Sequence, residues 1–190
     1  MIAAGLILAA GESRRMGSAK ALLQYRGETF LDRLTRIFGM YCESVVVVLG
    51  AGAEEIRGRL KRPAHIVINE QWRTGQTSSM QCGLRAIPPG VDGVLFTLVD
   101  HPAVAPETIR ALLTGGGHVR VPRFDGRRGH PIWFSRDLIP EFLAIPPGGA
   151  ARDVVRAHAS DTEFLDTNDP GILADIDDPA AYGALIGAEA

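Results

Sequence analysis

Small and cationic side chains gather between positions 9 and 20 in a pattern that suits polyphosphate binding. Small residues let backbone N–H groups approach a ligand closely, and cations neutralise its negative charge. The small residues are Ala9, Ala10, Gly11, Ser13 and Gly17, and the cations are Arg14, Arg15 and Lys20. The stretch therefore predicts an anion-binding loop, and the alternative is a strand-to-helix turn that carries solvated surface cations.

The spacing within this stretch excludes two common phosphate-binding motifs. A P-loop has Lys and then Ser or Thr directly after its second glycine, but Ser18 and Ala19 separate Gly17 from Lys20. A Rossmann fingerprint reads Gly-x-Gly-x-x-Gly, whereas Gly11 and Gly17 are six positions apart. The loop is therefore of a third kind.

A carboxylate stands where an apolar run ends. Asp100 follows the run 93–99, where a buried charge is costly without a partner. A bound triphosphate needs a divalent cation, which proteins hold through one or two carboxylates. Asp100 is therefore a candidate metal ligand, and the alternative is an Asp that caps the following turn. His101 could bind the metal or hydrogen-bond to one of its ligands.

Two further groups could complete such a site. The cluster Asp175, Asp177 and Asp178 could supply a second metal ligand or form a solvated loop. Residues 127–131 read Arg-Arg-Gly-His-Pro, whose cations could meet an anionic second substrate. A lone histidine such as His130 is more often structural than catalytic. Zinc is not expected, because no Cys or His pair has a zinc-like spacing.

Alternating apolar runs and helical periodicities must position these residues. Strands are predicted at 2–8, 45–49, 65–68 and 93–99. Helices are predicted to begin after Thr29, near 53, at Thr77 or Ser78, and at Pro106. This alternation implies a doubly wound α/β fold, with a mostly parallel sheet and helices on both faces. Ligands in such folds lie beyond the carboxyl ends of the strands, so the 9–20 loop and Asp100 should face one crevice.

The pattern changes from about residue 118. Residues 119–124 and 129–134 flank an Asp125-Gly126 turn and predict a β-hairpin, which we interpret as an insertion or a lid. A short helix capped by Ser135 and interrupted by Pro140, a helix at 150–158, a strand at 162–165 and a terminal helix at 179–187 are expected to follow. We expect one domain over 1–190, with a nucleotide-binding half at 1–115 and an acceptor-binding, closing half at 116–190.

Composition narrows the class of protein. Apolar residues make up 46% of the 190 residues and charged residues 22%, which is ordinary for a globular protein. A formal net charge of −2 argues against a nucleic-acid partner. No run reaches the roughly 18 apolar residues of a membrane span, and no leader is recognisable. We therefore expect a cytoplasmic protein in which Cys42 and Cys82 are reduced thiols.

The motifs resemble those of a known family. Residues 8–20 read Leu-Ala-Ala-Gly-Glu-Ser-Arg-Arg-Met-Gly-Ser-Ala-Lys and resemble the signature Leu-Ala-Ala-Gly-x-Ser-x-Arg-Met-Gly-x-x-Lys. That signature is typical of the MobA-like NTP transferases, the nucleotidyltransferases related to the molybdenum-cofactor enzymes. Residues 75–83, 100–102, 129–131 and 175–179 resemble later segments of the same family in the same order. The resemblance therefore spans nearly the whole chain.

The resemblance implies a role for each matching residue. A nucleotide would be bound by Leu8, Ala9, Ala10, Gly11, Ser13, Gly17, Lys20, Ser78 and Ser79. Arg15, Lys20 and Asp100 would be catalytic, Asp100 and Asp177 would hold Mg²⁺, and Arg128, Gly129 and His130 would contact the acceptor. Arg14 falls on a variable position of the signature and is expected on the solvated surface.

The resemblance also indicates substrates. The guanylyl branch usually reads Ala-Gly-Gly where this chain reads Ala-Ala-Gly, and Gly-His-Pro is typical of the cytidylyl branch. This implies transfer of CMP from CTP to the phosphate of molybdopterin, with release of pyrophosphate, for a molybdenum hydroxylase client. Asp178 and Ala181 depart from the closing motif, which has Thr and an acidic residue there. The alternatives are transfer to a sugar phosphate or another phosphorylated small molecule, and a non-catalytic protein that delivers the cofactor.

Overall fold

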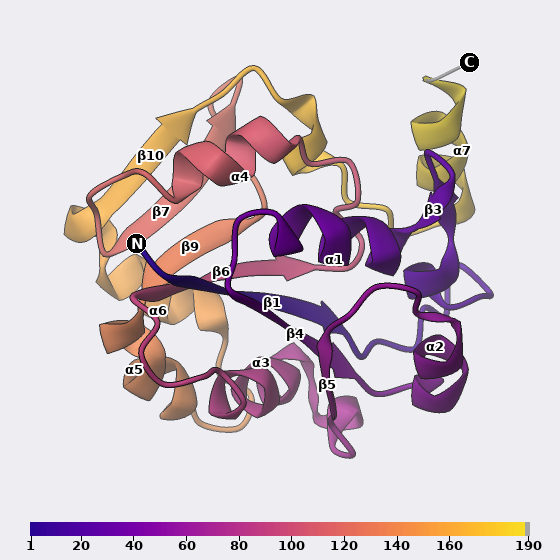
Figure 1. Ribbon diagram of the computed structural model, residues 1–190, viewed down its shortest axis with the longest axis horizontal. Helices are drawn as coiled ribbons and strands as arrows, with labels where there is room; N and C mark the ends of the chain where they lie inside the picture. The colour runs from indigo at the N-terminus through magenta and orange to yellow at the C-terminus, as the bar shows by residue number, and fades with distance from the viewer. Residues whose placement is uncertain (189–190) are drawn as a thin grey trace.

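A central sheet of eight strands runs through the molecule (Figure 1). The computed structural model describes residues 1–188. The strands follow the order β10-β7-β9-β6-β1-β4-β5, and β8 pairs with β7. Their bounds are β1 Ala3–Ala9, β4 Ser44–Leu49, β5 His65–Ile68, β6 Gly93–Leu98, β7 Val119–Phe124, β8 Arg127–Arg128, β9 Ile132–Ser135 and β10 Thr162–Asp166. Strands β2 (Gln24–Tyr25) and β3 (Glu28–Thr29) form a separate pair.

Strand β1 lies at the centre of the parallel part of the sheet. It pairs in parallel with β4 on one side and with β6 on the other. Every residue of β1 is buried, because helices cover both faces of the sheet, and its sequence is therefore apolar without alternation. Strand β9 runs antiparallel to both β6 and β7. The predicted mostly parallel sheet is thus confirmed.

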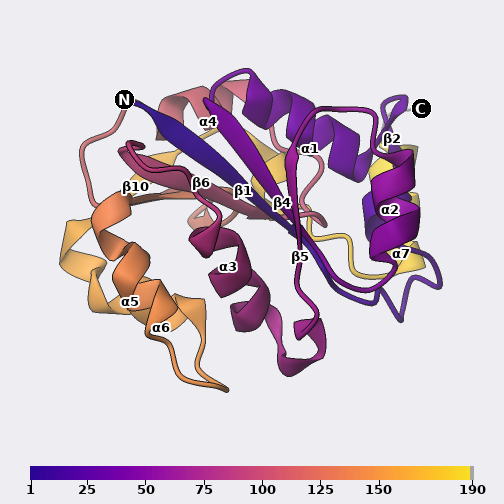
Figure 2. The same ribbon diagram turned by 60° about the horizontal axis from the view of Figure 1, so that its bottom comes forward.

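Helices form a layer on each face (Figures 1 and 2). Helices α1 (Phe30–Gly39) and α4 (Pro106–Leu112) cover one face, and α3 (Gln76–Arg85), α5 (Ile139–Leu143) and α6 (Ala151–Ala157) cover the other. Two apolar clusters fill these layers. Phe38 and Ile109 belong to the first cluster, and Met80 and Phe142 belong to the second. The doubly wound arrangement with two covered faces is confirmed.

The chain has two further α-helices and five 3₁₀ helices within residues 1–188. They are α2 (Ala53–Arg59), α7 (Pro179–Gly187) and the 3₁₀ helices η1 (Lys20–Leu22), η2 (Trp72–Thr74), η3 (Arg136–Leu138), η4 (Ala159–Asp161) and η5 (Pro170–Leu173). Three of the predicted helix starts are confirmed, and α2 begins at Ala53, as predicted. The side chain of Thr29 accepts the N–H of Asp32 at 3.0 Å, and Pro106 lies in the first turn of α4.

The predicted caps of α3 are wrong. The helix begins at Gln76, and its N-cap is Gly75, at φ 120°. The hydroxyl of Thr77 instead donates to the carbonyl of Gly149 at 2.7 Å, and that of Ser78 donates to the carbonyl of Gly75 at 2.8 Å. A side chain can cap only from the residue before the first helical turn, and that position holds a glycine. The first N–H groups of α3 therefore have no side-chain cap.

The region after residue 118 also differs from expectation. The Asp125-Gly126 turn forms and joins β7 to β8, but β7 and β9 belong to the central sheet and are neither an insertion nor a lid. Strand β9 fills the space between β6 and β7, because both of its edges find backbone partners there. Pro140 lies in the first turn of α5 and does not interrupt it, since that turn needs no N–H donor from it.

The expectations about the two cysteines and about a membrane span can be compared with the structure. Cys42 is buried and Cys82 is half-buried, and both are free thiols. Within residues 1–188, no helix has both the length and the apolar character required to cross a bilayer.

Candidate active site

A cavity of about 420 Å³ opens at the carboxyl ends of β1 and β6. The backbone leaves β1 at Ala9 and β6 at Leu98, and both strand ends line the cavity. The site residues predicted from the sequence that line it are Leu8, Ala9, Ala10, Gly11, Ser13, Arg15, Lys20, Ser79, Asp100 and Asp177. The 9–20 loop and Asp100 therefore face one crevice, as the α/β pattern predicts.

Five predicted site residues lie outside this lining. Gly17 adopts φ 72° within the loop and shapes its turn. Ser78 is engaged with the preceding turn and accepts a hydrogen bond from the Asn69 amide at 2.9 Å. Arg128, Gly129 and His130 line a second cavity of about 450 Å³.

The loop after β1 is closed by Ser13. Its carbonyl accepts the N–H groups of Met16 at 3.0 Å and Gly17 at 3.2 Å, and its hydroxyl accepts the N–H of Lys20 at 3.1 Å. The N–H groups of residues 11–15 find no acceptor within residues 1–188. Unpaired N–H groups beside cationic side chains are what an anion-binding loop requires.

Glycine at position 50 lets the next strand end pack against this loop. A Cβ there would lie 2.7 Å from the carbonyl oxygen of Ala10 and 2.7 Å from the Cβ of Trp72. The N–H of Ala51 donates to the same Ala10 carbonyl at 3.1 Å. The β4 exit therefore fixes the start of the loop.

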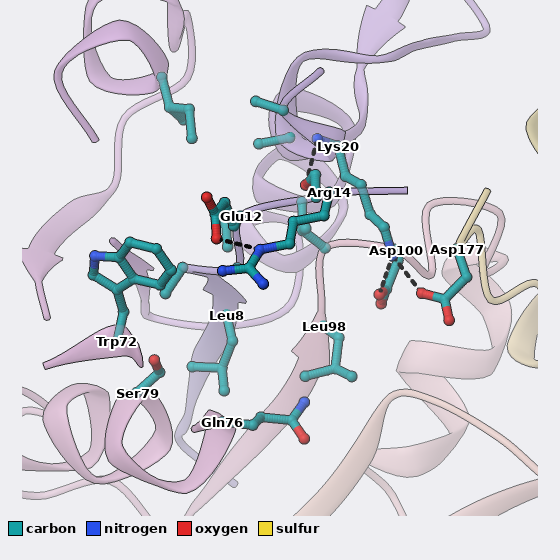
Figure 3. Close-up of a pocket in the computed structure, with 18 of the residues that line it drawn as sticks. Leu8, Glu12, Arg14, Lys20, Trp72, Gln76, Ser79, Leu98, Asp100 and Asp177 are labelled. Carbon is teal, nitrogen blue, oxygen red and sulfur yellow. Dashed lines mark hydrogen bonds and ion pairs between the residues drawn. The ribbon is translucent and has the colours of Figure 1, made fainter. Parts of the chain in front are cut away.

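Lys20 joins two carboxylates from distant parts of the chain (Figure 3). Its Nζ donates to Asp100 Oδ2 at 3.0 Å and to Asp177 Oδ1 at 2.5 Å. Arg15 donates to the other oxygen of Asp177 at 2.7 Å. The N–H of Ile176 donates to the carbonyl of Asp100 at 2.9 Å, which ties the C-terminal segment to the β6 exit. Lys20 thus contacts both predicted metal ligands, and Arg15 contacts Asp177.

The charges of this group act on each other. Burial alone would lower the pKa of Lys20, but the hydrogen bonds and charges of Asp177 and Asp100 raise it. The hydrogen bond from Lys20, with that from Arg15, lowers the pKa of Asp177 in spite of some burial. Burial, followed by the charges of Asp100 and Asp177, raises the pKa of Asp175. Lys20 is therefore a protonated ammonium held between carboxylates.

The carboxylate oxygens of Asp100 are suited to bind a divalent cation. Its Oδ2 accepts from Lys20, whereas its Oδ1 is buried and has no hydrogen-bond partner within the described chain. A buried carboxylate oxygen without a partner is a suitable ligand for a hard cation such as Mg²⁺. Asp177 fits less directly, because Lys20 and Arg15 take one of its oxygens each.

Sequence reasoning missed several lining residues. Trp72 and Gln76 come from η2 and the start of α3 and lie across the cavity from Lys20 in Figure 3. Their signal was a large aromatic in a polar loop ahead of a helix. Arg14 is 80% exposed, as expected, but borders the cavity and pairs with Glu12 at 2.7 Å.

The second cavity adjoins the first, since Gln76 and Leu98 line both. Arg128, Gly129 and His130 come from the segment after the β7–β8 turn. Helix α6 adds two arginines that the sequence did not single out, Arg152 and Arg156. The other lining residues are mainly apolar: Met80, Phe96, Val121, Ile132 and Val155. Such a surface suits an anion with an apolar or aromatic body.

His130 lies in the wall between this cavity and the Asp100 turn. Its ring centroid is 4.7 Å from that of His101. Burial, followed by the neighbouring His101, lowers the pKa of His130 to about 4. The ring is therefore neutral near pH 7, and the arginines carry the positive charge of the second cavity.

Comparison with known proteins agrees with this geometry. The model of the MobA-like NTP transferase domain matches residues 5–162. The chain belongs to this family of nucleotidyltransferases. The solved structure of Rv0371c from Mycobacterium tuberculosis superposes with a TM-score of 0.82 at 27% identity, covering 98% of both chains. The family resemblance seen in the sequence is thus confirmed.

Named relatives differ in their activities. Nicotine blue oxidoreductase from Paenarthrobacter nicotinovorans is 33% identical and covers 91% of both chains. A probable molybdenum cofactor guanylyltransferase from Mycobacterium ulcerans is 30% identical, over 96% of this chain and 92% of its own. The molybdenum cofactor cytidylyltransferase from Escherichia coli is 25% identical, over 92% of this chain and 90% of its own. The family is shared, and the substrates vary within it.

Proposed function

We propose that the protein transfers CMP from CTP to the phosphate of molybdopterin and releases pyrophosphate, with Mg²⁺ as cofactor. One observation carries this proposal. A polyphosphate-type cavity that contains Lys20 and Asp100 adjoins a cationic, apolar-walled cavity, and Gln76 and Leu98 lie at their boundary. A nucleotide in the first cavity would present its α-phosphate to an acceptor in the second.

The two cavities also support the proposed division of the chain. Residues 8–100 supply all of the first cavity except Asp177. Residues 121–156 supply most of the second. We therefore propose that 1–115 binds the nucleotide and that 116–190 binds the acceptor, with Asp177 closing the nucleotide site.

The reaction needs positioning and charge neutralisation more than covalent chemistry. A phosphate oxygen of the acceptor attacks the α-phosphorus and forms the new P–O bond. The bond to the bridging oxygen breaks in line, and its electron pair leaves with pyrophosphate. The free N–H groups of residues 11–15 hold the phosphates, while Arg15 and Lys20 neutralise the charge that develops on them.

The acidic residues complete this arrangement. Asp100, with Asp177, would hold Mg²⁺, which would supply further charge neutralisation at the phosphates. Incoming phosphates compete with the carboxylate of Asp177 for Arg15 and Lys20. Binding of the nucleotide therefore frees Asp177 for the cation, which couples metal binding to substrate binding.

Three considerations support CTP and molybdopterin within this family. The chain reads Ala9-Ala10-Gly11 where the guanylyl branch usually has Ala-Gly-Gly, and it contains Gly-His-Pro at 129–131. The E. coli relative is named as a cytidylyltransferase of the molybdenum cofactor. The second cavity pairs arginines with apolar walls, as a phosphorylated pterin requires. We propose a molybdenum hydroxylase as the client that receives the product.

The deciding experiment measures pyrophosphate release by the full chain with Mg²⁺. Each of the four ribonucleotides is offered with molybdopterin, with a panel of sugar phosphates, and without acceptor. Release that requires both CTP and molybdopterin is expected. Release with GTP and molybdopterin would overturn the choice of nucleotide, and release driven by a sugar phosphate would overturn the choice of acceptor. Binding of molybdopterin without any release would favour the delivery protein.

A further inference from the structure

Two segments of the chain beside the nucleotide cavity are joined at two points. Residues 20–24 contain η1 and the start of β2, and residues 177–182 lead into α7. At one end, Nζ of Lys20 donates to Asp177 Oδ1. At the other end, the hydroxyl of Tyr182 donates to the carbonyl of Gln24 at 2.8 Å. Tyr182 therefore attaches α7 to the segment that carries Lys20.

The aromatic ring of Tyr182 also packs on the core. It meets the ring of Phe30 edge-on, with centroids 5.9 Å apart and an interplanar angle of 70°, and Phe30 is fully buried at the start of α1. Within α7, Ala181 and Leu185 also contact this apolar cluster. None of the residues 179–187 is itself buried. Helix α7 is therefore held by few side chains, and Tyr182 contributes both packing and a hydrogen bond.

The carbonyl that Tyr182 binds belongs to the backbone that positions Lys20. The N–H of Leu23 donates to the carbonyl of Lys20 at 3.1 Å. Gln24 follows directly and pairs with Thr29 in the β2–β3 ladder. Tyr182 is therefore attached to a backbone whose position relative to Lys20 is set by hydrogen bonds.

Asp178 links the position of Tyr182 to that of Asp177. Its carbonyl accepts the N–H of Tyr182 at 3.1 Å, and its carboxylate accepts the N–H of Ala181 at 2.8 Å as the N-cap of α7. On the other side of Asp177, Ile176 is 3% exposed and lies in the core. The backbone of Asp177 is thus held between a buried residue and a capped helix that Tyr182 attaches.

The two attachments of this segment would respond differently to an anion in the cavity. Lys20 and Arg15 hold the side chain of Asp177 by charge, and phosphate oxygens would compete for the same cations. The partners of Tyr182, by contrast, are an uncharged carbonyl and an uncharged ring, and neither lines the cavity. An anion would therefore weaken the first attachment and leave the second intact.

We propose that Tyr182 is a positioning residue, which keeps Asp177 at the cavity after a bound polyphosphate has taken Lys20 and Arg15 from that carboxylate. Without Tyr182, residues 177–182 would stay in place in the empty site and detach when the anion binds. The anchoring itself comes into play whenever the ion pairs of Asp177 are broken. Its consequence for turnover rests on the proposed function, because there Asp177 has to remain beside the phosphates.

The test follows the backbone amide signals of residues 177–182 in the full chain by nuclear magnetic resonance. In the natural protein these signals should keep the dispersion of a folded segment with and without inorganic tripolyphosphate. In Tyr182→Ala they should do so only without the anion, and tripolyphosphate should move them to the values of an unstructured chain. Tyr182→Ala combined with Asp177→Asn should show the unstructured values without any ligand, because both attachments are then lost.

The matched control is Tyr41→Ala, because Tyr41 is also half-buried against the same apolar cluster and lies outside both cavities. It should leave residues 177–182 folded under both conditions. Folded signals in the double variant would overturn the proposal, and so would unstructured signals in Tyr182→Ala without the anion. If tripolyphosphate changes no cavity signal of the natural protein, the proposed function fails, and the double variant still decides the role of Tyr182.

Turnover separates positioning from a general loss of structure. Tyr182→Ala should lower the kcat of pyrophosphate release at least about tenfold, because a small misplacement of groups at the reacting centre is costly. The KM for CTP should stay within about twofold, since Lys20 and Arg15 still receive the phosphates. Tyr182→Phe keeps the ring on Phe30 and should recover most of the lost kcat. A natural kcat in Tyr182→Ala would overturn the positioning role.

Discussion

The ammonium of Lys20 lies 3.0 Å from the carboxylate of Asp100, although 80 positions separate the two residues. Lys20 begins the 3₁₀ helix after the loop, and Asp100 follows β6. Both side chains are largely buried, with 12% and 17% of their surfaces exposed. Without Lys20, the negative charges of Asp100 and Asp177 would face each other in the same cavity. The ammonium of Lys20 therefore offsets the charges of both carboxylates, and under the proposed function it would also receive phosphate.

Replacing Lys20 should abolish transfer while the fold survives. Lys20→Ala removes the ammonium that neutralises the phosphates and should lower the rate of pyrophosphate release by at least about a hundredfold. The matched control is Lys61→Ala, since Lys61 is exposed and lies outside both cavities. Circular dichroism should remain unchanged in both variants. A Lys20→Ala enzyme with near-normal turnover would refute the assigned role.

Loss of the Asp100 carboxylate should be equally severe. Asp100→Ala removes the proposed Mg²⁺ ligand of the transfer site, so turnover should vanish at every Mg²⁺ concentration. The measurement is pyrophosphate release across a Mg²⁺ titration, with Asp125→Ala in the β7–β8 turn as the control. Retention of a near-normal rate in Asp100→Ala would remove the basis for the metal assignment.

Arg33 should prove to be a support for the Asp100 turn. Its buried guanidinium donates through Nε to the carbonyl of Pro102 at 2.7 Å and lies over the ring of Tyr25, 5.1 Å from its centroid. Arg33→Met should cost about 2 kcal/mol of unfolding free energy, since a hydrogen bond from a charged donor is lost and a buried carbonyl stays unpaired.

Urea unfolding measures the change in unfolding free energy caused by Arg33→Met, and pyrophosphate release measures its effect on turnover. We expect the rate to fall together with stability, because the freed turn carries Asp100. Arg57→Met on the exposed face of α2 is the control and should change neither. Unaltered stability in Arg33→Met would show that the turn holds without it.

A methyl group at position 50 should disturb the nucleotide loop. Gly50→Ala places a Cβ 2.7 Å from the Ala10 carbonyl and from Trp72, so the loop must shift at a cost of about 1–3 kcal/mol. Isothermal titration calorimetry should show that Gly50→Ala binds CTP more weakly than the natural protein does. Gly58→Ala in α2 is the matched control: nothing lies within 4 Å of its Cβ, and it should stabilise the helix by about 0.5–1 kcal/mol. If Gly50→Ala and Gly58→Ala changed CTP affinity and stability equally, the close packing of Gly50 against Ala10 and Trp72 would be contradicted.

Arg128 should affect the acceptor and not the nucleotide. It lines the second cavity, whereas its neighbour Arg127 does not. Arg128→Ala should raise the KM for the acceptor about tenfold, as the loss of one charge-assisted hydrogen bond would, and should leave the KM for CTP unchanged. Arg127→Ala is the control. If Arg127→Ala raises the KM for the acceptor as much as Arg128→Ala does, the two arginines act through their charge at long range and Arg128 makes no direct contact with the acceptor.

The two thiols should differ in reactivity. Burial raises the pKa of Cys42 to about 12 and also raises that of Cys82, where the charge of Arg85 opposes it. Since the thiolate is the reactive form, Ellman's reagent at pH 8 should modify Cys82 first and Cys42 only on unfolding. In Cys82→Ser, fast modification should disappear until denaturant is added. Rapid reaction of native Cys82→Ser would show that Cys42 is accessible.

The sequence by itself determined the features that depend on neighbouring residues. The apolar run of β1, the small residues that follow it and the Thr29 cap of α1 are local, and each is found where it was predicted. The alternation of strands and helices determined the sheet, because a parallel connection leaves few topologies. It also placed the 9–20 loop and Asp100 at one edge. The order of motifs identified the family.

Only the tertiary structure decided which distant groups meet. The Ile176–Asp100 hydrogen bond brings Asp175 and Asp177 close to Asp100, where Asp175 lies near His101 and Asp177 contacts Lys20. No local pattern separates two aspartates that stand two positions apart. The placement of β9 inside the sheet likewise depends on long-range backbone pairing with β6 and β7. The loop was therefore readable from its composition, whereas the partners of its cations depended on how the whole chain packs.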